Sequence, residues 1–316
     1  MSFAQSDPLF WGLLAGLLAF LSVATLVGLV LKWRLAPGQP SAAIDNLHQR
    51  NLAWWWMIAV CATAFHFGLA GTLTLAVCLS FLALRELTAA LAWRDADHRA
   101  LLTVTYVLLP LQYLWVGLGV AWAVWVFLPL AGMVVLPAVL LLAGVSRGWL
   151  DSLVRLQWLA WIGVYAVSHL PALLHLRLPG DAQPLMLLIY FTLVVQLSDV
   201  FQFIWGKLIG RRPLAPQVSP GKTVEGVVGG FVSATAVGVM LADITPFEPW
   251  QAAGVSLLLC ATGLLGGLLM SAVKRERGLK DWGQSIGGHG GVMDRLDSVV
   301  LSAPVYYHLV RATWAV

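Results

Sequence analysis

Apolar runs long enough to cross a membrane recur along the whole chain. Hydrophobic residues make up 59% of the 316 positions and charged residues 11%, whereas a soluble domain carries about a quarter charged residues. A chain with so little charge cannot be solvated as a globule, so the composition predicts a polytopic membrane protein. Because backbone groups in lipid must satisfy their own hydrogen bonds, and Leu, Ala, Val and Trp dominate, we expect an all-α fold rather than a barrel.

The spans and their direction follow from the apolar runs and from the positions of Lys and Arg. The basic residues concentrate in alternate loops, with Arg177 as the main exception, so the positive-inside rule predicts that both termini lie outside. The same rule puts the 206–223 and 274–296 loops together on the cytoplasmic face of the cell (inner) membrane. We expect about ten spans: 9–31, 53–67, 69–84, 101–118, 119–143, 153–173, 184–205, 224–243, 251–272 and 297–314.

Several other classes of protein are disfavoured by the composition. The three cysteines lie inside apolar runs and form no C-x-x-C pair, which is typical of packed side chains rather than a zinc site or disulfides. The net charge of +4 fits the charge bias of cytoplasmic loops better than nucleic-acid binding.

We divide the chain into an N-terminal membrane region, 1–183, and a C-terminal catalytic membrane region, 184–316, which form one integral membrane unit.

The stretch Ser271–Asp297 is much richer in charged residues than the rest of the chain. Asp294 and Asp297 are three residues apart, so they share one face if the last helix begins near Asp294. Paired carboxylates suit Mg²⁺, which takes one or two carboxylates together with phosphate oxygens of a substrate. The alternative is a pair of helix-capping residues with a salt bridge to Arg295. Asp281 and Asp199, the latter at the end of an apolar span, are further candidate metal ligands.

Glycines and basic residues in the same stretch favour the binding of a phosphate-bearing substrate. Gly290 and Gly291 belong to a run of glycines around His289 that lets backbone approach a phosphate, and the histidine is a candidate for phosphate contact or proton transfer. The alternative for the basic side chains is a cluster that only sets topology, and we favour this for Arg277. The candidates for neutralising phosphate are Lys274, Arg275, Lys280 and Arg295.

A second polar loop precedes the segment 224–243. Lys222 lies between the hydroxyls of Ser219 and Thr223, an arrangement that suits phosphate binding. Its Gly-Lys-Thr sequence ends like a Walker A loop, but position 216 is Pro rather than Gly and no strand precedes it. Plain helix capping by Thr223 is the alternative.

Both loops resemble the signature of phosphatidate cytidylyltransferases (CDP-diacylglycerol synthases). The pattern S-x-x-K-R-x4-K-D followed by H-G-G-x-x-D-R-x-D is matched from Ser271 to Asp297, and 219–226 is similar to the family element S-P-K-K-T-x-E-G. The resemblance covers roughly the C-terminal 40% of the chain. It implies transfer of CMP from CTP to phosphatidate with Mg²⁺, with Lys280, Asp281, His289, Asp294 and Asp297 catalytic and Ser271 among the substrate contacts. A second cation and a homodimer are left open.

One position departs from the family pattern. Many members carry an acid four residues before the signature serine, where this chain has Gly267. The departure suggests a divergent branch and keeps three alternatives open: another lipid phosphate as acceptor, a non-catalytic relative, and a transporter. A transporter is disfavoured because its binding groups tend to lie near the membrane midplane, whereas the polar groups here follow span ends.

Overall fold

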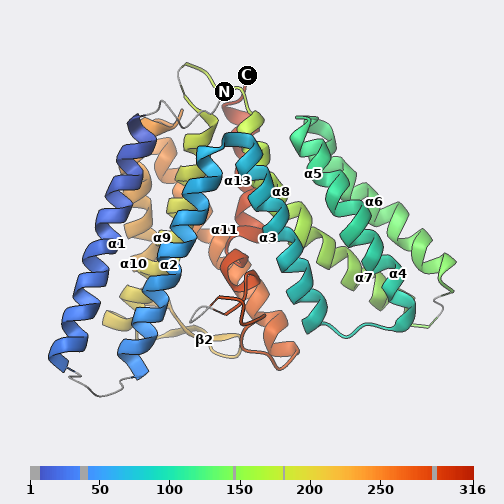
Figure 1. Ribbon diagram of the computed structural model, residues 1–316, viewed down its shortest axis with the longest axis horizontal. Coiled ribbons are helices and arrows are strands. Elements are labelled where there is room, and N and C mark those ends of the chain that lie inside the picture. The colour runs from blue at the N-terminus through green and yellow to red at the C-terminus, as the bar shows by residue number, and fades with distance from the viewer. Residues whose placement is uncertain (1–7, 36–41, 145–146, 181, 287–289) are drawn as a thin grey trace.

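The structure is a computed structural model that describes residues 8–35, 42–144, 147–180, 182–286 and 290–316 (Figure 1). It is built from helices, with one short antiparallel hairpin, β1 (Pro213–Ala215) and β2 (Ser219–Thr223). The helices are α1 (Pro8–Leu35), α2 (Ala42–His66), α3 (Gly68–Ala90), α4 (His98–Thr103), α5 (Leu109–Gly117), α6 (Ala121–Leu142), α7 (Trp149–Ala160), α8 (Ala166–Ala172), α9 (Pro184–Ile209), α10 (Val224–Met240), α11 (Pro249–Glu276), α12 (Met293–Leu296) and α13 (Val299–Thr313). Short π-helical segments, Val104–Leu108 and Trp161–Tyr165, join α4 to α5 and α7 to α8.

The all-α prediction is confirmed, and the protein is an integral membrane protein. Six helical stretches in the described ranges are long and apolar enough to cross a membrane. They correspond to the predicted segments 9–31, 69–84, 101–118, 119–143, 184–205 and 251–272. The other four predicted segments fall on α2, α7–α8, α10 and α13, which do not meet that measure, so the count of ten spans stays a prediction.

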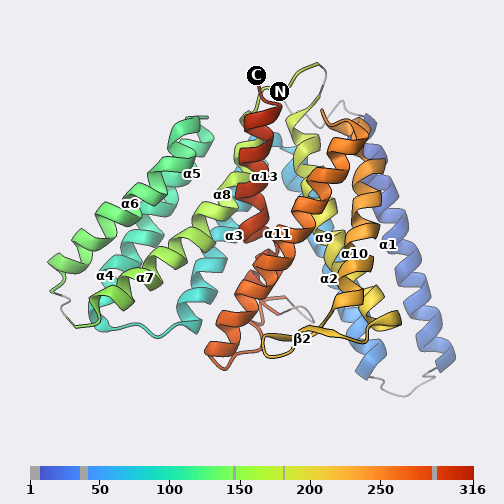
Figure 2. The same cartoon turned by 180° about the vertical axis from the view of Figure 1, so that it is seen from behind.

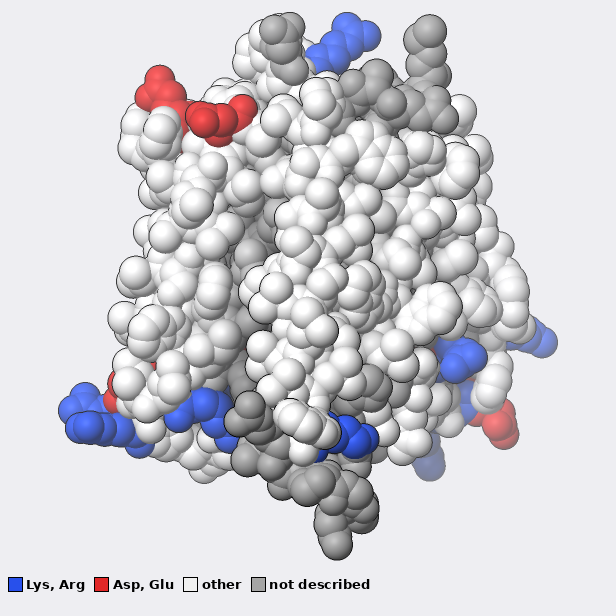
Figure 3. All heavy atoms as spheres, turned by 60° about the vertical axis from the view of Figure 1, so that its left-hand side comes forward, with Lys and Arg blue, Asp and Glu red and all other residues white. Residues whose placement is uncertain are grey.

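The two ends of the molecule differ in charge. α1 begins at the same end at which α13 finishes, and the hairpin β1–β2 lies at the opposite end (Figures 1 and 2). Lys and Arg gather mainly at the hairpin end, and uncharged side chains cover the wide surface between the ends (Figure 3). This is the asymmetry on which the predicted orientation depends, although the side of the membrane that each end faces remains a prediction.

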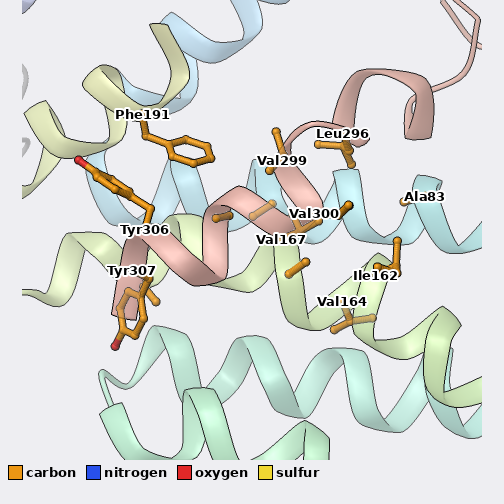
Figure 4. Packing of buried hydrophobic residues seen from close by; sticks show 14 of the residues in the cluster. Ala83, Ile162, Val164, Val167, Phe191, Leu296, Val299, Val300, Tyr306 and Tyr307 are labelled. Atoms are coloured by element: carbon orange, nitrogen blue, oxygen red, sulfur yellow. The ribbon is translucent and has the colours of Figure 1, made fainter. Parts of the chain in front are cut away.

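Aromatic packing holds α13 in the centre of the molecule. Tyr306 stacks on Phe191 of α9, with ring centroids 5.4 Å apart, and its hydroxyl donates to the Leu187 carbonyl at 3.2 Å. Figure 4 shows these rings in the same buried cluster as Val299, Val300, Val164 and Val167. Since α13 is fixed between α8 and α9, the residues just before it are fixed as well.

Glycines bring α9 and α10 into backbone contact. A Cβ atom added at Gly226 would lie 2.9 Å from the Gly206 Cα, and one at Gly230 would lie 2.8 Å from the Gln202 nitrogen. Small residues at such positions allow helices to approach closely in a membrane. The close approach sets β2, which leads directly into α10, against the last turns of α9.

Candidate functional site

Asp294 is buried and fully engaged by the surrounding chain. Its Oδ1 accepts a hydrogen bond from Lys274 Nζ at 2.7 Å, and its Oδ2 accepts from the backbone N–H groups of Trp282 at 2.8 Å and Gly291 at 2.9 Å. The side chains of Lys274 and Asp294 are 9% and 4% exposed, so this is a buried ion pair in which both oxygens of Asp294 accept hydrogen bonds. In this arrangement Lys274 and Asp294 tie the backbone of Trp282 and Gly291 to α11.

A carboxylate that the sequence analysis missed holds the other side of the same loop. Glu86 of α3 is buried, and it accepts hydrogen bonds from Ser285 Oγ at 2.6 Å and from the backbone N–H groups of Val292 at 3.0 Å and Met293 at 2.9 Å. These contacts join residues about 200 positions apart and satisfy N–H groups at the start of α12. The available signal was an acid at the end of an apolar segment, where an unpaired charge is costly.

The glycines of this loop make room for the two carboxylates. A Cβ atom at Gly291 would lie 2.3 Å from Glu86 Oε2, and one at Gly290 would lie 2.7 Å from Asp294 Oδ2. Gly290 also has a φ of +81°, a conformation that disfavours other residues. The predicted substrate contacts of Gly290 and Gly291 are untested, and both face protein carboxylates in this structure. His289 lies outside the described residues.

A second charged cluster lies where α9, β2, α11 and the start of α13 meet. Lys222 Nζ lies 3.3 Å from Asp199 Oδ1 and 3.5 Å from Gln202 Oε1. Asp297 lies between α12 and α13, where its Oδ1 accepts a hydrogen bond from the Ser298 N–H at 2.8 Å. Partial burial, followed by the nearby Asp199 carboxylate, raises the pKa of Asp297 to about 6. The cluster therefore holds two carboxylates that repel each other and one lysine.

Gly266 and Gly267 of α11 form one wall of this cluster. A Cβ atom at Gly266 would lie 2.5 Å from the Asp297 carbonyl oxygen, so only glycine fits there without displacing backbone. A Cβ atom at Gly267 would meet Lys222 Nζ at 3.7 Å, an ordinary contact. The position at which many family members carry an acid thus faces the lysine of the cluster, and a side chain there has room.

The other candidate residues lie around the two clusters. Thr223 caps α10 by accepting a hydrogen bond from the Gly226 N–H at 3.1 Å, as the capping alternative predicted. Arg275 donates to the carbonyl oxygens of Val218 at 3.2 Å and Leu279 at 2.9 Å, so it joins the two motif loops. Lys280 and Asp281 are exposed, and Ser219 and Ser271 are half-buried.

The residues present fit a Mg²⁺ site with two acidic ligands better than the predicted site with four. No group of three or more His, Cys, Asp and Glu side chains gathers in the ranges that the structure describes. Both oxygens of Asp294 already accept hydrogen bonds from protein donors, and Asp281 is exposed beside Gly290. Asp199 and Asp297 repel each other, and a divalent cation would relieve that repulsion. These two are therefore the candidate ligands, with substrate phosphate oxygens to complete the shell.

The fold and this site define a helical integral membrane protein with buried carboxylates and lysines at the convergence of two loops. Comparison with known proteins identifies the family to which the chain belongs. The model of the cytidylyltransferase family matches residues 48–313, so the chain belongs to this family. Family membership implies that the protein uses CTP.

Relatives fall into two groups by how much of the chain they match. An uncharacterized protein of Escherichia coli, YnbB, is 34% identical over 304 residues, 94% of this chain and 97% of its own length. A phosphatidate cytidylyltransferase of Mycobacterium leprae is 38% identical over 152 residues, 48% of this chain and 47% of its own length. One of Staphylococcus aureus is 38% identical over 120 residues, 37% of this chain and 46% of its own length. The chain thus spans just under half of the relatives named as phosphatidate cytidylyltransferases.

Proposed function

We propose that this protein transfers CMP from CTP to a lipid that carries a phosphate group, and that phosphatidate is that lipid. The carrying observation is the cluster of Asp199, Lys222 and Asp297, built from both motif loops at the hairpin end of the helices. A single lysine beside two carboxylates suits a cation and a polyphosphate bound together. The similarity to proteins named as phosphatidate cytidylyltransferases supports phosphatidate as the acceptor.

The reaction requires little covalent chemistry from the protein. An oxygen of the lipid phosphate attacks the α-phosphorus of CTP and forms the new P–O bond. The bond from that phosphorus to the oxygen bridging to the β-phosphate breaks, and pyrophosphate leaves with the bonding electrons. Positioning and charge neutralisation then account for most of the rate. Lys222 neutralises phosphate charge at the cluster, and the exposed Lys280 is available to the outer phosphates of CTP.

Mg²⁺ held by Asp199 and Asp297 would supply electrostatic stabilisation of the phosphate oxygens. Asp294, Lys274 and Glu86 act by fixing the loop that forms the wall of the site. These roles differ from the sequence prediction, in which Asp294 and Asp297 bind the metal together. It assigns the metal to the half-buried Asp297 and a positioning role to the buried Asp294.

The test is an assay of purified protein in detergent with labelled CTP and phosphatidate, with Mg²⁺ or with EDTA. We expect CDP-diacylglycerol and pyrophosphate in equal amounts with Mg²⁺, and no product with EDTA. Folded protein that yields no CDP-diacylglycerol with any divalent cation would refute phosphatidate as the acceptor. A matched reaction with water as the only acceptor separates transfer from CTP hydrolysis.

A different lipid phosphate is the second candidate acceptor. It is favoured by Gly267 and by the near full-length similarity to a relative that is itself uncharacterized. Assaying a series of lipid phosphates in parallel with phosphatidate distinguishes the two. Transfer to another member of the series without transfer to phosphatidate would support this candidate, and transfer to none would favour a non-catalytic role.

The proposal also requires both motif loops to face the cytoplasm, where CTP is found. Single cysteines at Gln217 and Gln284, in a chain whose three native cysteines are replaced, should react only from the cytoplasmic side. A cysteine at Gln183, at the opposite end of α9, should react only from outside. Labelling of positions 217 and 284 from opposite faces would contradict one joint site.

A further inference from the structure

An apolar cavity of about 650 Å³ lies beside the candidate site, between the α1–α2 pair and helices α3 and α9. Its volume is within the range of cavities that hold small ligands. Its walls are mostly aliphatic and aromatic side chains, such as Leu17 of α1, Met57 of α2 and Leu79 of α3. The face of the molecule that carries α1 is covered by uncharged side chains, as expected for a surface against lipid (Figure 3).

One end of the cavity reaches the charged clusters. Leu197, two residues before Asp199, lines it, and so does Ser285, which donates to Glu86. Arg295 also lines this end, and its Nε is buried without a hydrogen-bond partner in the described part of the chain. A buried guanidinium nitrogen with no acceptor is costly, and a phosphate oxygen is the acceptor that best matches it.

The cavity extends from there along the membrane-spanning part of α9. Leu188 lines it as well as Leu197, and nine residues of α-helix cover about 13 Å. α2 and α9 run in opposite directions (Figure 1), so the last turns of α2, which include Ala62, lie at the same end as the first turns of α9, which include Leu188. The cavity thus has a cationic end at Arg295 and an apolar part that follows several turns of α9.

We infer that this cavity binds an acyl chain of the lipid-phosphate acceptor, with the acceptor phosphate at Arg295. The inference rests on the proposed function and adds to it the path of the lipid tail and the helices that form it. An ordinary membrane lipid could fill the apolar part, but a zwitterionic headgroup would leave the Arg295 charge poorly matched. A phosphate monoester matches that charge, and Arg295 stands two residues before the candidate metal ligand Asp297 in the sequence.

The first test changes the far end of the cavity and measures chain-length selectivity. Ala62→Trp should lower kcat/KM for phosphatidate with 18-carbon chains by about tenfold or more, on the scale of overfilling an apolar site. It should leave kcat/KM for dioctanoyl phosphatidate nearly unchanged, because short chains end before that position. The control is Ala59→Trp, on the same helix at an exposed position that does not line the cavity. Equal effects on both acceptors, or none, would overturn the inference.

A second measurement does not depend on CMP transfer. Phosphatidate with a photoreactive group near the end of one acyl chain should label α2 and α9 in the wild-type protein, as mapped by mass spectrometry. Unlabelled phosphatidate should compete with it, whereas phosphatidylcholine at the same concentration should not. Equal competition by both lipids would show a surface for bulk lipid and overturn the inference. Specific labelling of a protein that transfers no CMP would sink the proposed function and leave the lipid-phosphate cavity standing.

Discussion

Glu86→Ala tests whether a carboxylate on α3 holds the motif loop in place. Removal of the carboxylate leaves the N–H groups of Val292 and Met293 without acceptors in a buried position, and it frees the Ser285 hydroxyl. An unsatisfied buried donor costs about 1–3 kcal/mol, so two of them cost about 4 kcal/mol together. Ser285 adds little, because it is exposed and its hydroxyl can turn toward water.

The loss should open the loop locally rather than unfold the helices, since α3 packs through other residues such as Ala83, Leu84 and Leu87. At about 1.4 kcal/mol for each factor of ten, 4 kcal/mol corresponds to amide exchange about a thousandfold faster in residues 291–294. Hydrogen exchange with mass spectrometry, on protein in detergent, measures this. Glu276→Ala removes an exposed carboxylate whose salt bridge to Arg277 is 3.6 Å long, and it is the control. Unchanged exchange in Glu86→Ala would refute the assignment of Glu86 as the loop's anchor.

Three further predictions concern the charged clusters. Asp297→Asn should reduce the rate of CMP transfer by about a hundredfold or more without unfolding the protein, and the control Asp243→Asn, at an exposed position at the opposite end, should leave that rate unchanged. Near-normal activity of Asp297→Asn would show that Asp297 does not hold the metal. Lys274→Met leaves Asp294 buried without its cation and should destabilise the fold by about 3–5 kcal/mol, seen as a lower unfolding temperature in detergent; an unchanged temperature would contradict a closed ion pair. The Gly267→Asp protein should fold and show an altered Mg²⁺ dependence of the rate, because the new carboxylate would face Lys222. Gly266→Ala should instead lower the stability of the protein, because its Cβ would meet the Asp297 backbone. The reverse order of stability would show that α11 packs differently.

The sequence determined the class of the protein and the location of its polar loops. Low charge and repeated apolar runs predict a membrane protein, and in lipid a helix satisfies all of its backbone hydrogen bonds internally. Six of the predicted segments are helices of spanning length. The motif spacing led to the cytidylyltransferase family, which the family match over residues 48–313 confirms. Both results depend on composition or on residues close together in the chain, and such information is present in a single sequence.

Only the tertiary structure decided which acid does what. Asp294 and Asp297 are three residues apart, yet α12 ends at Leu296 and α13 begins at Val299, so the break directs one carboxylate to Lys274 and the other toward Asp199. The role of Glu86 was inaccessible because its donors lie about 200 residues away. Helical periodicity specifies which residues share a face of one helix, but partners across helices depend on packing of the whole chain, and that packing fixes the charges at this site.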